Sequence, residues 1–340
     1  MAYTTINKHT DYFNTVLWTG NGSTMTITDV GFNADLVWTK LRSGTDDHRL
    51  FDKVRGINKY VKSNSTAAQT TDAILSTTSD GYSLASAGEV TANTGTFVGW
   101  NWLANGAGSS NSDGSVTSTV SASTTAGFSI VTWTGTGATA TIGHGLGVKP
   151  EMIWIKNTGA VENWIVYHAG IGSGNNLKLN LADAQQDTTG AFNDTDPTTS
   201  VFTVHTNTNA NQSGQLHVAY CFASKKGYSK VGTYIGSGET DGPFVYTGFA
   251  PQFVLFKRST GSAGDWQLWD RKRDPFNPTE RAIHVNATGG PSTDQDIDLL
   301  SNGFKIRSNT GHLNNSTTSF PYIAFGQTMV GTNDIPAAAR

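Results

Sequence analysis

Three aspartates stand at alternate positions near the end of the chain, in the stretch STDQDIDLL. Side chains alternate across a β-strand, so Asp294, Asp296 and Asp298 would point to one side of an extended segment. Carboxylate oxygens are the hard ligands that Ca²⁺ prefers. The spacing therefore predicts a candidate calcium site. The alternative interpretation is a solvated loop whose charges only repel one another.

A second group combines cations with aromatic rings in the stretch WDRKRDPFNP (269–278). An exposed aromatic ring beside polar donors is a common sugar-binding arrangement, because one face of a sugar ring is apolar and its hydroxyls need polar partners. Trp269, Arg271 and Arg273 are therefore candidates for a glycan contact or a contact between subunits. The alternative is an ion-paired edge strand whose long side chains cover apolar surface.

Trp100 and Trp102 form a further candidate pair for a glycan or subunit contact, since they point to the same face of one expected strand. The chain has nine tryptophans, and most lie at expected strand positions. Packing in a core or on a sheet face is the default use of tryptophan there. Which rings are exposed stays open at this point.

No familiar catalytic pattern accompanies these candidates. The five glutamates are more than ten residues apart, so the two carboxylates of a glycan hydrolase would have to meet in space. Asp270 with Glu280 is a candidate for such a pair. The spacings of zinc sites, nucleophile elbows and phosphate loops are missing. We expect no enzymatic activity and no cofactor beyond the candidate Ca²⁺.

The elements that would position these residues recur three times along the chain. The stretches GFNADLVWTK (31–40), GLGVKPEMIWIK (145–156) and GFAPQFVLFK (248–257) each run from a glycine through alternating apolar residues to a lysine. Each follows an aromatic strand with a tight turn and precedes a second aromatic strand. Blocks of about a hundred residues are too long for solenoid repeats, and each is long enough to bury its own core.

Short alternating strands with abundant Gly, Thr, Ser and Asn predict an all-β fold of three tandem homologous β-sandwich units, jelly-roll-like in type. The predicted parts are an N-terminal arm (1–14), unit 1 (15–104), a linker (105–127), unit 2 (128–230), unit 3 (231–328) and a C-terminal tail (329–340). The linker lacks large apolar side chains, although SVTSTVSA could add an edge strand. Sandwiches joined in series would form a rod or wedge, with the arm and tail free to reach neighbours.

Composition narrows the classes of partner. Only 14% of residues are charged and the formal net charge is −3, so no basic face for nucleic acid is implied. No apolar run is long enough to insert into a membrane. The N-terminal stretch shows no signal peptide. The single cysteine, Cys221, excludes an internal disulfide and is expected to be buried and inert.

The order of motifs resembles a domain that is frequent in predicted virion proteins of tailed bacteriophages, especially marine phages. It runs from AGFSIVTWTGTG through GHGLGVKPEMIWIKN, AYCFASKKGYSKVGTYIGSG and DGPFVYTGF to YIAF. The resemblance covers nearly the whole chain, including AYTTI and IPAAAR. It implies a repeat-containing, tail-fibre-like structural component of the virion, and the family offers no established catalytic residues to carry over.

The expected function is that of a non-enzymatic bacteriophage virion structural protein, namely a tail-associated fibre or receptor-binding component. The alternatives are a head decoration or head-fibre protein, and a carbohydrate-binding or glycan-cleaving adhesin. Expected partners are other virion proteins, further copies of the chain in a trimer, and a glycan of the host surface. The expected location is the virion, after synthesis in the host cytoplasm.

Overall fold

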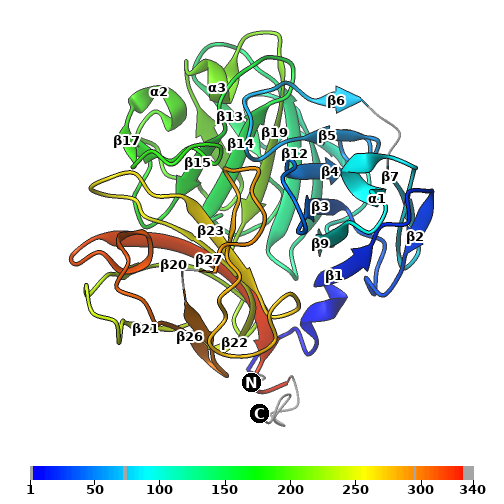
Figure 1. Ribbon diagram of the computed structural model, residues 1–340. Helices are drawn as coiled ribbons and strands as arrows, with labels where there is room; N and C mark the ends of the chain where they lie inside the picture. The colour runs from blue at the N-terminus through cyan, green and yellow to red at the C-terminus, as the bar shows by residue number, and fades with distance from the viewer. Residues whose placement is uncertain (1–2, 72–74, 294–295, 332–340) are drawn as a thin grey trace.

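Strands dominate the computed structural model, which describes residues 3–71, 75–293 and 296–331 (Figure 1). The helices in these ranges are single turns: η1 (His9–Asp11), α1 (Gly88–Thr91), α2 (Thr189–Phe192), α3 (Thr208–Asn211) and α4 (Gly311–Asn314). The predicted all-β fold is confirmed. In the same ranges, none of these helices has the length and apolar character needed to cross a membrane.

Three large antiparallel sheets form the framework. Sheet I has the order β1 (Phe13–Thr19), β9 (Thr96–Trp102), β3 (Leu36–Leu41), β4 (Arg49–Asp52), β5 (Lys59–Val61), β6 (Thr70–Thr71). Sheet II has the order β10 (Ser109–Asn111), β11 (Ser118–Ser123), β12 (Phe128–Thr134), β19 (Leu216–Phe222), β14 (Met152–Asn157), β15 (Ile165–His168). Sheet III has the order β20 (Ser229–Ile235), β27 (Ser319–Thr328), β22 (Phe249–Lys257), β23 (Trp266–Asp270), β24 (Ile283–His284).

The three sheets share a four-strand pattern, which reads β1-β9-β3-β4, β12-β19-β14-β15 and β20-β27-β22-β23. Small antiparallel groups accompany them: β2 (Met25–Ile27) with β8 (Gly81–Leu84) and β7 (Leu75–Thr78), β13 (Ala140–Gly143) with β18 (Val201–Val204), and β21 (Phe244–Tyr246) with β26 (Gly303–Ile306) and β25 (Ile297–Leu299). A further pair is β16 (Asn175–Asn176) with β17 (Gln186–Asp187). We call residues 13–102, 109–222 and 229–328 segments I, II and III.

One face of each large sheet packs against its own small sheet. Val37 and Phe97 of sheet I share a core with Tyr82 of β8. Sheets II and III have separate cores of the same kind, with β13 and β18 in one and β21, β25 and β26 in the other. Each segment is therefore a two-layered sandwich with a core of its own.

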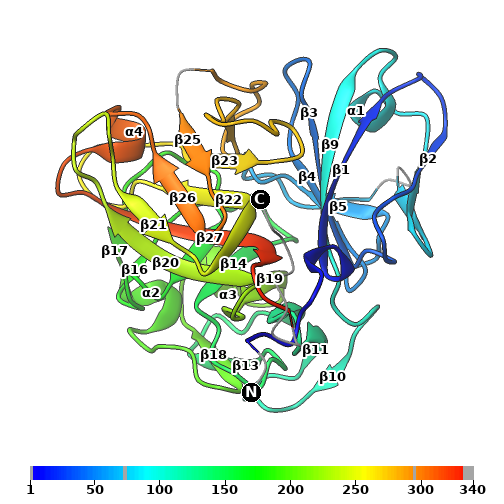
Figure 2. The same ribbon diagram turned by 90° about the horizontal axis from the view of Figure 1, so that it is seen from below.

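The opposite faces of the three large sheets meet in one central core. Trp100 of β9, Tyr220 of β19 and Phe325 of β27 belong to it, together with Trp38, Trp154 and Phe253 from the neighbouring strands. Because side chains alternate along a strand, a strand with a core on both sides must be apolar on both faces. Figure 2 shows the blue-to-cyan, green and yellow-to-red segments grouped on three sides of this centre.

A buried lysine at the end of each repeated strand joins one segment to the next. Each ammonium donates to a carbonyl of another segment: Lys40 to Thr288 at 3.0 Å, Lys156 to Thr66 at 3.1 Å and Lys257 to Ala182 at 2.9 Å. Segment I thus contacts III, III contacts II, and II contacts I. Burial lowers the pKa of each of the three lysines to about 8. The carbonyls compensate part of the cost of burying these charges.

Ring N–H groups at the start of the next strand in each segment form hydrogen bonds to another segment in the same cyclic order. Trp164 donates from Nε1 to the carbonyl of Lys62, and Trp266 donates to that of Lys178, each at 2.8 Å. In segment I, His48 takes the equivalent position. Its Nδ1 accepts from the indole of Trp38, so its Nε2 carries the hydrogen and donates to the carbonyl of His284 at 3.2 Å.

Two buried Asp–Arg pairs complete the junctions. Asp52 accepts from Arg55 Nε at 2.5 Å and from the hydroxyl of Tyr220 at 2.8 Å. Asp270 accepts from Arg273 Nε and from Trp100 Nε1, the latter at 2.9 Å. In each case the third group comes from another segment.

Segment II has His168 at the corresponding position. Its Nε2 lies 3.2 Å from the carbonyl of Tyr322 in segment III, and its Nδ1 accepts from the backbone of Gly170 at 3.0 Å. A neutral ring with hydrogen on Nε2 satisfies both contacts. Burial is the largest cause that lowers the pKa of His168, to about 4.

Three details of the predicted organisation need correction. Residues 105–127 are not a free linker, because β11 pairs with β12 and β10 pairs with β11, as the alternation in SVTSTVSA allowed. The sandwiches do not form a rod in series, because they share the central core. Strands β1 and β20 begin at Phe13 and Ser229, two residues before the predicted unit boundaries.

The described part of the N-terminal arm is not free either. Ile6 is 2% exposed and belongs to the central core. Tyr3 donates to the carbonyl of Gly248 at 2.9 Å, and His9 contacts Gln327 at 2.9 Å. The arm therefore packs against segment III of its own chain. Residues 332–340 of the predicted tail lie outside the described ranges.

We predict that Asp52→Asn destabilises the fold by about 3–5 kcal/mol, because the change leaves the buried Arg55 guanidinium without its counter-charge. Urea unfolding followed by tryptophan fluorescence measures this loss. Asp241→Asn is the matched control, since Asp241 also bonds cations but is exposed. Equal stability of the two variants would contradict the role given to the Asp52–Arg55 pair.

Acid should destabilise the protein in the window between pH 6.5 and pH 4. In the unfolded chain His168 binds a proton near its ordinary pKa of 6.5, whereas in the fold its pKa is about 4. Stability is thus fully present above pH 6.5 and falls as the pH falls, by about 3 kcal/mol for a difference of this size. Urea unfolding across this range should show a shallower pH slope for His168→Gln, whose amide can still donate to Tyr322. An identical slope would contradict the assignment.

Candidate functional site

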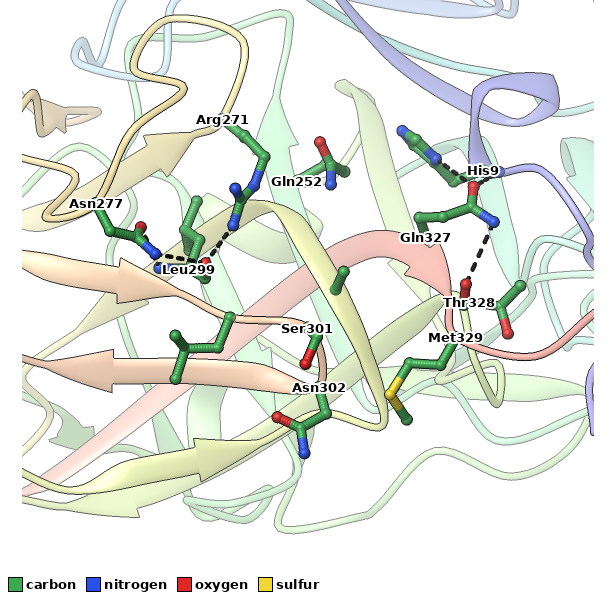
Figure 3. A pocket seen from close by; sticks show the side chains of 12 residues that line it. His9, Gln252, Arg271, Asn277, Leu299, Ser301, Asn302, Gln327, Thr328 and Met329 are labelled. Atoms are coloured by element: carbon green, nitrogen blue, oxygen red, sulfur yellow. Dashed lines mark hydrogen bonds between the residues drawn. The ribbon is translucent and has the colours of Figure 1, made fainter. Parts of the chain in front are cut away.

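A cavity of about 750 Å³ opens beside sheet III (Figure 3). Its walls are His9, Ala250, Gln252, Arg271, Asn277, Leu299, Leu300, Ser301, Asn302, Gln327, Thr328 and Met329. This volume lies within the range of about 300–1,000 Å³ that is usual for small-molecule sites. We call it the segment III pocket.

Strand irregularities of sheet III create the pocket. The pairing of β22 with β27 shifts register between Pro251 and Phe253, which leaves Gln252 as the extra residue of a bulge. Proline has no N–H for the ladder, so it favours a bulge at this position. Beyond the bulge the two strands continue to pair through Ala250 with Gln327 and Phe249 with Thr328. The prolonged strand pair forms one wall of the pocket.

The second wall is the turn between β25 and β26 with the loop after β23. Asn277 Nδ2 donates to the carbonyl of Leu299, and the backbone N–H of Leu299 donates to Asn277 Oδ1, each at 3.0 Å. Arg271 also donates from Nη2 to the carbonyl of Leu299. These bonds hold the Arg271 and Asn277 side chains along the wall, as Figure 3 shows.

The N-terminal segment closes the third side. The ring of His9 lies with Nδ1 2.9 Å from Gln327 Oε1, and Gln327 Nε2 donates to the carbonyl of Asn7 at 2.7 Å. An amide oxygen can only accept, so Nδ1 of His9 carries the hydrogen. Burial is the largest cause that lowers the pKa of His9 below its ordinary value. The ring is therefore neutral at pH 7.

A smaller cavity of about 110 Å³ lies behind the same side chains. His9, Gln252 and Arg271 line both cavities, and the smaller one reaches Asn14 and Lys272. These shared residues form the partition between the two spaces. A ligand in the segment III pocket would meet amides and a guanidinium on this side.

The lining chemistry suits binding better than reaction. Its polar groups are amides, hydroxyls, one imidazole and one guanidinium, and none of the twelve lining residues is a carboxylic acid or a cysteine. General acid–base hydrolysis of a glycan needs two carboxyl groups at the scissile bond. Amides and hydroxyls both donate and accept, which suits a ligand with many hydroxyls.

The family model described as Domain of unknown function (DUF7483) matches residues 8–328. The chain belongs to this family. The match begins before β1 and ends with β27, so the family domain contains all three large sheets and the walls of the pocket up to Thr328. No curated protein and no solved structure matches the chain.

Of the residues proposed from the sequence for a glycan or subunit contact, Arg271 lines the pocket, whereas four others are buried and the prediction for them was wrong. Trp100 and Trp102 are 0% exposed in the central core. Trp269 is also 0% exposed and stacks on Phe256 in the outer core of segment III. The guanidinium of Arg273 forms a buried ion pair with Asp270. The three tryptophans pack between layers because the strands that carry them, β9 and β23, have a core on each side. Arg273 lies in the turn after β23, where Asp270 holds it.

The candidate calcium site is described only in part, because Asp294 lies outside the described ranges. Asp298 accepts from Arg307 Nε at 2.6 Å, an ion pair that competes with a cation for this carboxylate. Calcium binding by the three aspartates stays a prediction. Asp270 is buried against Arg273 and Trp100, while Glu280 is exposed, so they do not form a pair of catalytic carboxyls.

Sequence reasoning missed most of the pocket. His9 and Gln327 are separated by 318 positions, and no periodic pattern links them. The one local signal was Pro251 inside an apolar strand, since proline there indicates a bulge or an edge. That signal points to Gln252 but not to the residues opposite it.

The burial of the tryptophans can be tested in solution. All nine are at most 8% exposed. We predict blue-shifted fluorescence and weak acrylamide quenching for the folded protein, with quenching rising to that of free N-acetyl-tryptophanamide in urea. Strong quenching of a large part of the native emission would show exposed indoles and would restore tryptophan as a surface contact.

Proposed function

We propose that the protein is a non-enzymatic structural protein of a bacteriophage virion and serves as a tail-associated receptor-binding component. The resemblance of its motifs to those of phage virion proteins supports a role in the virion. The segment III pocket supports attachment, because it offers hydrogen-bonding groups without the carboxyl pair of a glycan hydrolase. The observation that carries the structural role is the cycle of buried contacts between segments.

That cycle also supports a triplicated origin of the fold. We propose that segments I, II and III are three copies of one sandwich unit. Their lysines, Lys40, Lys156 and Lys257, occupy the same place in the repeated strand and each bonds the next segment in the same rotational sense. A cyclic arrangement of like units closes on itself, as the subunits of a homotrimer do.

One chain would then do the work of three subunits. The inner faces of the three sheets already bury one another, so a trimer of chains is not needed to cover them. We propose that a single chain occupies a threefold position of the particle or of a fibre tip. Such a chain would be rigid, because moving one segment would break contacts with both others.

A first prediction concerns mass in solution. Sedimentation of the purified chain at micromolar concentration should give the mass of one chain, since the inner faces of the three large sheets already cover one another. Asp241→Asn serves as a surface control and should sediment identically. A stable trimer at this concentration would contradict the single-chain proposal.

A second experiment tests location and role. Immunogold labelling of intact particles should place the protein on the tail, and the purified chain should reduce adsorption of the phage to its host in a dose-dependent way. Label on the head with no effect on adsorption would overturn the tail proposal in favour of head decoration. Absence of the protein from purified particles would overturn the virion role itself.

A further inference from the structure

We infer that the segment III pocket binds an oligosaccharide, with one sugar inside the pocket and the next stacked on an aromatic surface made by the exposed ring of Tyr246 and the partly buried ring of Tyr3. This inference deepens the receptor-binding role proposed above and names the class of ligand. It rests on three observations: hydrogen-bonding groups of the pocket that the fold does not use, the exposed ring of Tyr246 beside Tyr3, and the continuity between this surface and the pocket.

The first observation is the set of unused polar groups. Within the described part of the chain, the side chains of Gln252, Ser301 and Asn302 form no hydrogen bond, although all three line the pocket. The backbone of Asn302, by contrast, is used to hold the β21 end of the sandwich. Amide and hydroxyl groups that have no partner within the protein can both donate to and accept from sugar hydroxyls.

The second observation is the aromatic surface. Tyr246 is 52% exposed on β21, an edge strand, although the nine tryptophans are all buried. Lys230 fixes this tyrosine, because its ammonium lies 5.6 Å from the ring centroid and donates to the Tyr246 carbonyl at 2.7 Å. A Cβ atom on Gly248 would stand 3.2 Å from the Tyr3 hydroxyl and 3.5 Å from the Tyr246 hydroxyl, so the two rings lie close together and form one surface. Burial, followed by the neighbouring Tyr246, raises the pKa of Tyr3.

The third observation is that this surface borders the pocket. The carbonyl of Asn302, a residue of the pocket wall, accepts from the backbone N–H groups of Thr247 and Gly248 at 3.0 and 3.1 Å. Tyr246 directly precedes Thr247 in the chain and therefore borders the pocket. Tyr3 donates to the carbonyl of Gly248. On the Thr328 side of the pocket the link is Gly227.

Gly227 lies between the pocket and the Tyr3 ring. A Cβ atom on this glycine would stand 2.9 Å from Thr328 Oγ1 and 3.2 Å from Tyr3 Cε1. Its φ of +77° also favours glycine. The close approach that glycine permits brings Tyr3 next to Thr328, a wall of the pocket. A chain of sugars leaving the pocket on this side would meet the aromatic surface at once.

Sugars match this combination in both parts. A pyranose presents an apolar face of C–H groups to an aromatic ring and hydroxyls around its edge. The pocket is also lined by Leu300, Ala250 and Met329, which can contact such a face. The amides and hydroxyls of the pocket can bind neutral sugars, and the Arg271 guanidinium can bind acidic ones. The test therefore includes both neutral and acidic oligosaccharides.

The experiment uses the purified full chain and an array of neutral and acidic oligosaccharides from bacterial surface polysaccharides. We expect binding to a subset of them, with affinity then measured by calorimetry. Tyr246→Ala should weaken the affinity at least tenfold, whereas Tyr246→Phe, which keeps the ring, should stay within threefold of the native affinity. The double variant Gln252→Ala, Asn302→Ala should also lose at least tenfold.

Ile235→Ala is the matched control, because Ile235 is 57% exposed and lies outside the pocket lining. It should bind like the native chain, and all variants should keep the native melting temperature within a few degrees. No binding to any oligosaccharide, or unchanged affinity in folded Tyr246→Ala and the double variant, would overturn the inference. Because the isolated chain is used, this outcome is distinct from failure of the virion role, which the particle labelling decides.

Discussion

The structure depends on one constraint, namely that three sheets bury their inner faces against each other in a single apolar centre. Each sheet contributes wide aromatic side chains, such as Trp100, Trp154 and Phe253. Removing one segment would expose the faces of the other two, so the segments must stay together although each has an outer core of its own. Large apolar area removed from water drives this arrangement, and hydrogen bonds at its edge determine the orientation of the sheets.

The contacts around the core show which features the arrangement requires and which it tolerates. A buried lysine is present in all three segments, so its link to the next segment is general. The ring that donates beside it is Trp164 or Trp266, but His48 does the same work in segment I. The Asp–Arg pair of segments I and III is replaced by a neutral histidine in segment II. What is common is a buried polar group at a fixed place that forms a hydrogen bond with a partner across the junction.

The sequence allowed the all-β fold and the repeated strands to be predicted, because alternation and turn residues are local signals. It even showed that the repeated strands are apolar on both faces, as in Ile153 and Trp154, which lie in different cores. It could not show that the second face belongs to a core shared by three segments, since that depends on contacts a hundred residues apart. The same limit left Trp100, Trp102 and Trp269 as candidates for a surface contact, although all three are buried. Aromatic residues at strand positions look alike in the sequence whether they face a neighbour or the solvent.

The position of the pocket follows from the same constraint. The central core fixes the strands that build it, so β3 and β14 have six residues each and β9 and β19 have seven. In segment III, β22 has nine residues and β27 has ten, and the additional pairs extend past the bulge at Pro251. Those additional residues, with Gln252 of the bulge, supply one wall of the pocket. They lie beyond the repeated part of the strands, where a change of side chain does not disturb the junctions. The side chains of the pocket can therefore vary while the three-sheet core stays the same, which separates the scaffold from the pocket.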